Sequence, residues 1–181
     1  NPEMAMVFQS PVLMPWRTIL QNVLLPIEFR RGDLGAAVIR ARNLLDMVGL
    51  SDFEASYPHE LSGGMQQRAA IVRALISDPG ILLMDEPFGA LDAMTREQMS
   101  IELLRIWDAS RKTIVFVTHS ITESIFLADR VFVLTPRPGT LAEIVNIDLP
   151  RPRTLSMINT EAFGIYSRQI RELLQAEGDI S

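Results

Sequence analysis

The chain alternates between short apolar runs and longer segments in which apolar residues recur every three or four positions. The short runs are typical of β-strands, and the periodic segments are typical of amphipathic α-helices. Strands are predicted at residues 4–8, 81–84, 113–118, 131–135 and 142–148. Helices are predicted at residues 33–48, 62–77, 96–110, 122–128 and 160–175. Because strands and helices alternate, we expect an α/β fold with a parallel sheet.

Short-range signals support several of these boundaries. Asp33 and Ser62 are residue types that cap helix N-termini, and Gly49 suits the end of a helix. The runs at 81–84 and 113–118 contain no charged residue, so we expect them to form buried parallel strands.

The pattern also predicts how the chain is organised. Residues 15–77 lack a predicted strand and indicate an inserted helical subdomain, whereas residues 78–149 contain the main strands. Residues 150–181 predict a helical C-terminal extension. Residues 10–32 are expected to form loops and short turns. The reason is a set of residues that interrupt helices: Pro11, Pro15, Pro26 and Gly32.

Composition excludes several classes of protein. With 181 residues, of which 48% are hydrophobic, the chain can bury the core of one ordinary domain. Its net charge of −5 argues against binding to nucleic-acid phosphates, and the absence of cysteine excludes disulfides and thiolate chemistry. No segment is apolar enough to span a bilayer, and the first residues do not resemble a signal peptide, so a cytosolic location is expected.

Lysine usage restricts the chemistry further. Of the 17 basic residues only Lys112 is a lysine. A site that requires a lysine therefore has one candidate in this sequence.

The segment Ser62-Gly63-Gly64 opens a predicted helix. Glycine at a helix start costs stability, but it exposes backbone N–H groups at the positive end of the helix dipole, beside a serine hydroxyl. Such an arrangement suits a phosphate group. The alternative is a turn that Ser62 caps and that binds nothing.

Polar side chains follow three of the predicted strands. Asp85 and Glu86 come after 81–84, where ligands bind in parallel sheets. A carboxylate there could hold Mg²⁺, and a second could deprotonate water. Gln9 and His119 follow two other strands in the same way. For each residue alone, a solvated strand end is the competing interpretation.

Taken together and in this order, the segments resemble the ATP-binding subunit of ABC transporters. Gln9 is similar to the Q-loop, residues 61–68 to the signature motif, and residues 81–86 to the Walker B strand with its catalytic glutamate. Residues 90–92 resemble the D-loop, and His119 the switch histidine. The resemblance implies a P-loop NTPase (RecA-like) core with an inserted helical subdomain.

The resemblance also implies the roles of these residues. Glu86 would activate water, His119 would contact the γ-phosphate of ATP, and Asp85 and Gln9 would arrange Mg²⁺. Phosphoryl transfer of this kind depends on positioning and on charge stabilisation.

A head-to-tail dimer with a second ABC ATPase subunit, as a homodimer, is implied as well. Residues 62–64 would then contact the partner's ATP, and Asp92 would bridge the two sites. Residues 10–60 would form a groove for a helix of a membrane permease. Trp16 either lines that groove or belongs to the core. The subunit would act at the cytoplasmic face of the membrane, with a periplasmic or surface solute-binding protein as an indirect partner and no nucleic acid.

Four segments indicate the branch of the family, because they resemble the corresponding parts of importers of nitrate, sulfonates, taurine and pyrimidines: residues 7–16, 22–26, 128–139 and 149–152.

Two departures from the family pattern matter. Met65 stands where the signature usually has glutamine, so any glutamine contact with nucleotide is lost or passes to Gln66.

The second departure is that no G-x-x-x-x-G-K-[ST] phosphate loop occurs in the chain, and Lys112 lies in the wrong place to supply its lysine. We therefore expect a fragment whose first strands and phosphate loop lie before Asn1. Two alternatives stay open: a soluble ABC ATPase that acts on DNA or ribosomes, and a non-catalytic remnant. Only 52 residues separate Gln9 from Ser62 and they lack sustained heptads, which disfavours the coiled-coil DNA-repair type.

Overall fold

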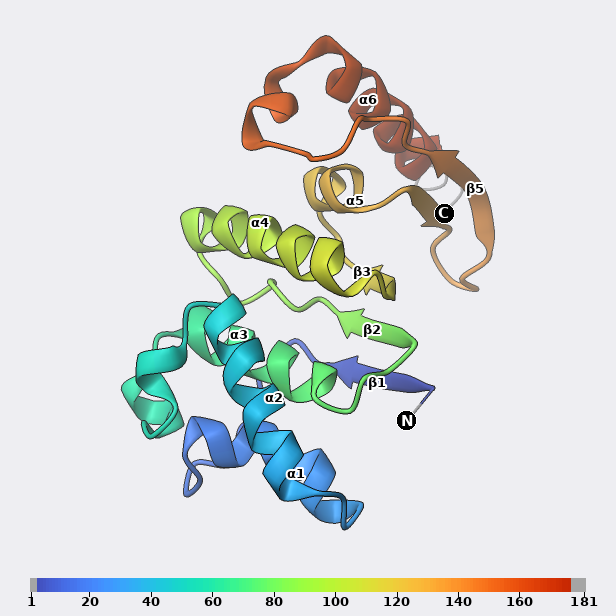
Figure 1. Ribbon diagram of the computed structural model, residues 1–181. Helices are drawn as coiled ribbons and strands as arrows, with labels where there is room; N and C mark the ends of the chain where they lie inside the picture. Colours follow the sequence, from blue (N-terminus) through green and yellow to red (C-terminus); the bar gives the residue numbers. More distant parts are fainter. Residues whose placement is uncertain (1–2, 177–181) are drawn as a thin grey trace. The chain divides into compact units, whose positions relative to one another are not determined.

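The computed structural model describes residues 3–176, which form two compact units that meet in the chain between Val117 and Thr118 (Figure 1). The division of the chain at residues 77 and 149 into subdomain, core and extension stays a prediction. The first unit contains β1 (Met4–Val7), α1 (Ile19–Phe29), α2 (Leu34–Met47), α3 (Gly63–Leu75), β2 (Ile81–Asp85), α4 (Ala93–Ser110) and β3 (Thr113–Val117). The second contains α5 (Ile121–Leu127), β4 (Arg130–Leu134), β5 (Leu141–Asn146) and α6 (Glu161–Ala176).

The first unit is organised around a parallel sheet with the strand order β1-β2-β3. Val7 lies opposite Met84, and Asp85 lies opposite Val117. This register brings the carboxyl ends of β1 and β2 to the same edge of the sheet. The residues that follow those two strands, Gln9 and Glu86, are therefore neighbours although 77 positions separate them in the sequence.

The two faces of this sheet differ in burial. Val7, Leu82 and Met84 are buried, and α3 packs against β1. The prediction of a buried strand at 113–118 is wrong, because β3 has no buried residue and Val117 is 52% exposed. On the opposite face Leu83 is half-buried, and five other apolar residues are 37–52% exposed: Met4, Met6, Ile81, Val115 and Val117. Within the first unit the helices cover one face, so an apolar run alone overstated the burial.

Helix α1 corrects the expectation of loops throughout residues 10–32. Thr18 caps it in a capping box with Gln21, and Ile19 and Val23 are fully buried where α1 packs against α2 and α3. Pro26 lies inside the helix, where it cannot donate a backbone hydrogen bond. Burial of the apolar side outweighs this local cost, which the sequence pattern alone did not reveal.

The neighbouring helices follow their predicted signals. Asp33 caps α2 by accepting hydrogen bonds from two backbone amides, and Gly49 ends it with a φ of +66°. Ser62 caps α3, which is buried over much of its surface. Between α2 and α3, residues 50–61 contain two short 3₁₀ turns, Ser51–Phe53 and Pro58–Glu60.

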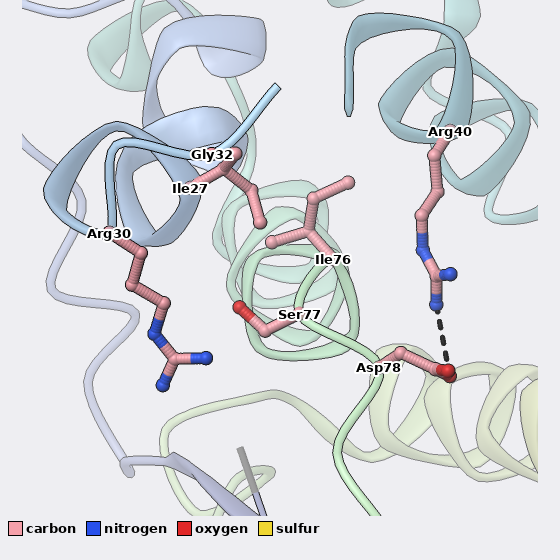
Figure 2. A pocket seen from close by; sticks show the side chains of 7 residues that line it. All are labelled: Ile27, Arg30, Gly32, Arg40, Ile76, Ser77 and Asp78. Carbon is pink, nitrogen blue, oxygen red and sulfur yellow. Dashed lines mark hydrogen bonds and ion pairs between the residues drawn. The ribbon is translucent and has the colours of Figure 1, made fainter. Parts of the chain in front are cut away.

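A cavity of about 270 Å³ lies near the C-terminal end of α3, away from the signature glycines at the helix start (Figure 2). On one side of it, Arg40 of α2 forms an ion pair with Asp78, 3.1 Å between Nη2 and Oδ1. Lys112 Nζ also donates to Asp78 Oδ1 at 2.8 Å. The single lysine therefore joins the start of β3 to the end of α3, which is a structural task.

These two cations make the folded state sensitive to acid. The hydrogen bonds from Lys112 and then Arg40 hold the pKa of Asp78 below its ordinary value of 3.8. A carboxylate with a lowered native pKa stabilises the fold above the unfolded-state pKa, and that contribution is lost as the pH falls through the native pKa. We expect Asp78→Asn to lower Tm at pH 6, and the difference from wild type to shrink below about pH 4. A difference independent of pH between 2.5 and 6 would contradict this assignment.

The second unit contains an antiparallel pair, β4 and β5, joined by a turn. Val133 and Val145 are buried, and α6 packs against both strands and against α5. Arg153 is almost entirely buried and donates to the carbonyl oxygens of Ile125, Phe126 and Ala128. A guanidinium at the C-terminus of α5 satisfies carbonyl groups that the helix leaves unpaired.

Candidate functional site

Gln9 and Glu86 converge on one glycine at the edge of the sheet. A Cβ atom built on Gly89 would lie 3.0 Å from Gln9 Nε2 and 3.4 Å from Glu86 Oε2. The amide of Gly89 donates to the carbonyl of Glu86 at 3.0 Å. A Cβ at residue 89 would require the end of the Gln9 side chain to shift slightly, whereas its distance from Glu86 Oε2 is that of an ordinary contact.

The backbone of Glu86 is held in an unusual conformation. Its φ is 41°, in the left-handed region that non-glycine residues rarely adopt, and Pro87 follows it. The Glu86 amide donates to the carbonyl of Val117 at 2.9 Å, which ties the turn to β3. Such a conformation costs about 1–3 kcal/mol and persists where surrounding structure holds it. The half-buried Glu86 carboxylate is thus placed by the turn, while Asp85 is exposed at the end of β2.

The signature segment forms the start of α3. Ser62 Oγ accepts a hydrogen bond from the Met65 amide at 3.4 Å, so the serine is a helix cap, as predicted. Gly63 is exposed and Gly64 is buried. A Cβ on Gly64 would lie 2.7 Å from Thr95 Cγ2, which is too close for any real contact. That these residues bind phosphate stays a prediction.

Thr95 connects the signature to the residues that resemble a D-loop. Asp92 caps α4 by accepting from the Thr95 amide at 3.0 Å and from its hydroxyl at 2.6 Å. The hydroxyl bond, above all, lowers the pKa of Asp92. Because the methyl group of Thr95 touches Gly64 and its hydroxyl holds Asp92, one side chain fixes both segments.

Gln66 has contacts within the chain. Its Nε2 donates to the carbonyl oxygens of Pro58 and Leu61, at 2.9 and 3.2 Å. These bonds attach the start of α3 to the 3₁₀ turn before it. A contact between Gln66 and nucleotide, in place of the glutamine replaced by Met65, stays a prediction.

His119 belongs to the second unit, where its neighbours form a small network. The Thr118 hydroxyl donates to the Glu123 carboxylate at 2.6 Å, and the Ser120 amide donates to that hydroxyl at 3.0 Å. Ser120 Oγ in turn accepts from the Glu123 amide. The exposed His119 is therefore held between two residues whose positions are fixed. Its contact with a γ-phosphate stays a prediction.

The sequence pattern did not single out Gly89 or Thr95, nor two residues of α3 that donate to the backbone on either side of Gln9: Gln67 and Arg73. Gln67 offered a sequence signal, because it lies four residues before the apolar Ile71 and so on the same side of the helix. In the structure Gln67 is 1% exposed. A glutamine on a buried helix face needs a hydrogen-bond partner. The contact of Thr95 with Gly64 had no sequence signal, since tertiary packing alone creates it.

The residues present fit the metal and nucleotide that the motifs imply. Mg²⁺ prefers oxygen ligands and usually keeps several waters, so one carboxylate, Asp85, and one amide oxygen, from Gln9, form a suitable protein set. Residues 3–176 hold no group of three or more His, Cys, Asp or Glu side chains that could bind a metal ion, and a Mg²⁺ site at Asp85 and Gln9 stays a prediction. The amides of Gly63 and Gly64 at the start of α3 suit a phosphate. Residues 1–181 contain no phosphate-loop motif.

Trp16 and the helices bear on the permease prediction. Trp16 is 71% exposed, so it does not belong to the core. Among the helices of residues 3–176, none has both the length and the apolar content of a membrane span.

The comparisons with known proteins agree with the motifs. The ABC transporter family model matches residues 1–89. An ABC transporter ATP-binding protein of Methanocaldococcus jannaschii is 51% identical over 94% of this chain and 63% of its own length. The taurine import ATP-binding protein of Rhizobium johnstonii is 47% identical over 96% of this chain and 68% of its own. The nitrate import ATP-binding protein of a Synechocystis strain is 43% identical over 94% and 66%.

A solved structure supports the fold. It is a dimeric ATP-binding cassette in a post-hydrolysis state, bound to ADP and Pi, with a TM-score of 0.67 and 35% identity over 82% of this chain and 65% of that one. The chain spans about 60% of the length of each of the first two curated relatives that it matches. The prediction of a P-loop NTPase fold is confirmed, and the chain belongs to the ABC transporter ATP-binding family.

Proposed function

We propose that this chain is part of an ATPase subunit that energises solute import. In this proposal Glu86 is the catalytic carboxylate, and residues 61–68 are the signature motif. The observation that carries the proposal is the convergence of Gln9 Nε2 and Glu86 Oε2 on Gly89, at the edge of the sheet where ligands bind. A strand end without a function has no need of a strained glutamate beside an amide side chain from another strand.

In this proposal Glu86 accepts the proton of the attacking water. Its carboxylate is half-buried and its backbone is fixed on both sides, so it can be held in line with the scissile bond. Mg²⁺, when bound beside Asp85 and the Gln9 amide oxygen, would neutralise phosphate charge. His119 donates a hydrogen bond to the γ-phosphate.

The signature serves a second ATPase subunit. Ser62 and the amides of Gly63 and Gly64 contact the ATP of the partner in a head-to-tail homodimer, and Asp92 joins the two sites. The dimeric structure neighbour bound to ADP and Pi supports this arrangement. Since residues 1–181 contain no phosphate loop, we expect this chain alone to hydrolyse ATP at a negligible rate.

The transport assignment follows the relatives. Taurine, nitrate and aliphatic sulfonate import ATP-binding proteins are 38–47% identical to the chain over most of its length. We infer an importer of a small oxyanion-bearing solute, with a permease docked on residues 10–60 at the cytoplasmic face of the membrane. A solute-binding protein would deliver the solute.

The test uses the complete subunit, expressed with its neighbouring membrane genes. We expect Mg²⁺-dependent ATP hydrolysis, which Asp85→Ala should abolish, and co-purification with a permease, which that variant should keep because the permease is proposed to dock on residues 10–60. Asp148→Ala, which removes an exposed carboxylate outside the site and outside residues 10–60, is the control for loss of one carboxylate. Co-purification with nucleic acid in place of a permease would instead support a soluble ABC ATPase. Hydrolysis by residues 1–181 alone would contradict the expected dependence on a phosphate loop.

A further inference from the structure

Two side chains of α3 hold the backbone on both sides of Gln9. Gln67 Nε2 donates to the carbonyl of Phe8 at 3.2 Å. Arg73 donates to the carbonyls of Pro11 and Val12, at 2.8 and 2.7 Å. One helix therefore supplies all three of these hydrogen bonds to a segment 59 or more positions away in the sequence.

These bonds are costly to lose. Gln67 is 1% exposed, so water cannot replace the Phe8 carbonyl as the partner of its amide group. Arg73 is partly buried, and burial lowers the pKa of its guanidinium. A buried donor that loses its acceptor is left without compensation for its lost hydration. The segment around Gln9 is thus attached to α3 at two independent points.

The backbone of this segment is also strained at one of the two residues that Arg73 binds. Val12 has a φ of 46°, a conformation that is rare for a β-branched residue, and its side chain is 58% exposed. Packing of the side chain therefore does not impose the conformation. The hydrogen bond from Arg73 to the Val12 carbonyl is the observed contact that can hold it.

The same helix begins at the signature. Gly64 lies against Thr95 at its N-terminus, while Gln67 and Arg73 lie about one turn and about two and a half turns further along. A displacement of the signature would move both anchors together, and with them Gln9, whose Nε2 lies beside Glu86 and Gly89.

We propose that Gln67 and Arg73 are positioning residues through which α3 couples the signature to Gln9. The inference rests on the proposed function, in which the signature contacts the partner's ATP and Gln9 contacts the ATP of its own subunit. In the dimer, occupation of one site then aligns Gln9 and Glu86 at the other. Such a link between two binding sites produces positive cooperativity.

The first arm of the test measures the anchors without any nucleotide. Limited proteolysis of the chain reports local opening of residues 8–14, since the cleavage rate follows the population of the open form. We expect Gln67→Met and Arg73→Met each to speed cleavage there by about 5–10-fold, the loss of one or two hydrogen bonds. Arg73→Lys, which keeps a donor, should give an intermediate rate even if Arg73→Met folds poorly.

Arg105→Met is the control. Arg105 of α4 also makes a side-chain hydrogen bond, to Glu102 at 3.0 Å, but it lies outside the site and outside residues 10–60 and does not hydrogen-bond to residues 8–14. We expect it to leave cleavage in this segment unchanged. Cleavage at residues 30–33, between α1 and α2, normalises every variant for global stability. Unchanged cleavage at 8–14 in both methionine variants would overturn the anchoring.

The second arm measures ATP hydrolysis by the complete subunit as a function of ATP concentration. We expect a Hill coefficient above 1 in wild type and in Arg105→Met, and a value close to 1 in Gln67→Met and Arg73→Met. Faster cleavage with an unchanged Hill coefficient would overturn the coupling. Absence of hydrolysis in the wild-type subunit would overturn the proposed function and the coupling together, whereas the cleavage result would still stand.

Discussion

Replacing Glu86 with glutamine should reduce ATP hydrolysis by the complete subunit on the order of 10²–10⁴-fold, the usual contribution of a general base. Glutamine has nearly the same shape, so it can keep the place beside Gln9 and Gly89, but it cannot accept a proton from water. Binding of ATP does not require that proton transfer. The variant should therefore accumulate as an ATP-bound dimer, which size-exclusion chromatography with and without ATP can detect.

Glu97→Gln is the control for this experiment. Glu97 is an exposed glutamate on α4. Its replacement by glutamine removes the same charge, but outside the site. We expect it to hydrolyse ATP as wild type does and to show no ATP-dependent trapping. Turnover by Glu86→Gln at the wild-type rate would remove Glu86 from its assigned role, even if the subunit is an ATPase.

The adjacent glycines of the signature should respond in opposite ways to alanine. In Gly64→Ala the new Cβ would lie 2.7 Å from Thr95 Cγ2, so either α3 or Thr95 has to move. Overpacking of this kind costs about 1–3 kcal/mol. In Gly63→Ala the nearest atom, Leu91 Cδ2, is 3.7 Å away, which is an ordinary contact. Since alanine is the better helix residue, that change should be neutral or stabilising by up to about 1 kcal/mol.

Urea unfolding of the chain measures both changes, and a third variant identifies the cause. Thr95→Ser removes the methyl group but keeps the hydroxyl that holds Asp92. Combined with Gly64→Ala, it should restore most of the lost stability, because the two changes act on one contact. Equal destabilisation of Gly63→Ala and Gly64→Ala would show that the contact with Thr95 is not the reason for glycine at position 64.

The helix caps illustrate what local sequence determines. Ser62, Asp33 and Gly49 act where predicted, since capping depends on a residue and the three or four that follow or precede it. Helix α1 shows the opposite case. The prolines of residues 10–32 argued for loops, yet Ile19 and Val23 are buried against other helices, and no window of sequence contains those partners.

For the site, the order of motifs was enough to identify the family and to predict which residues carry the chemistry. Gln9, Glu86 and Asp92 could be predicted only together, because each residue alone is also typical of a solvated strand or helix end. Only the parallel register of β1 and β2 decided that Gln9 meets Glu86 at Gly89. Likewise, only packing decided that Thr95 meets Gly64 and that Gln67 reaches Phe8. Local patterns predict helices, strands and candidate site residues. Contacts between distant segments instead arise from burial, which depends on the whole chain.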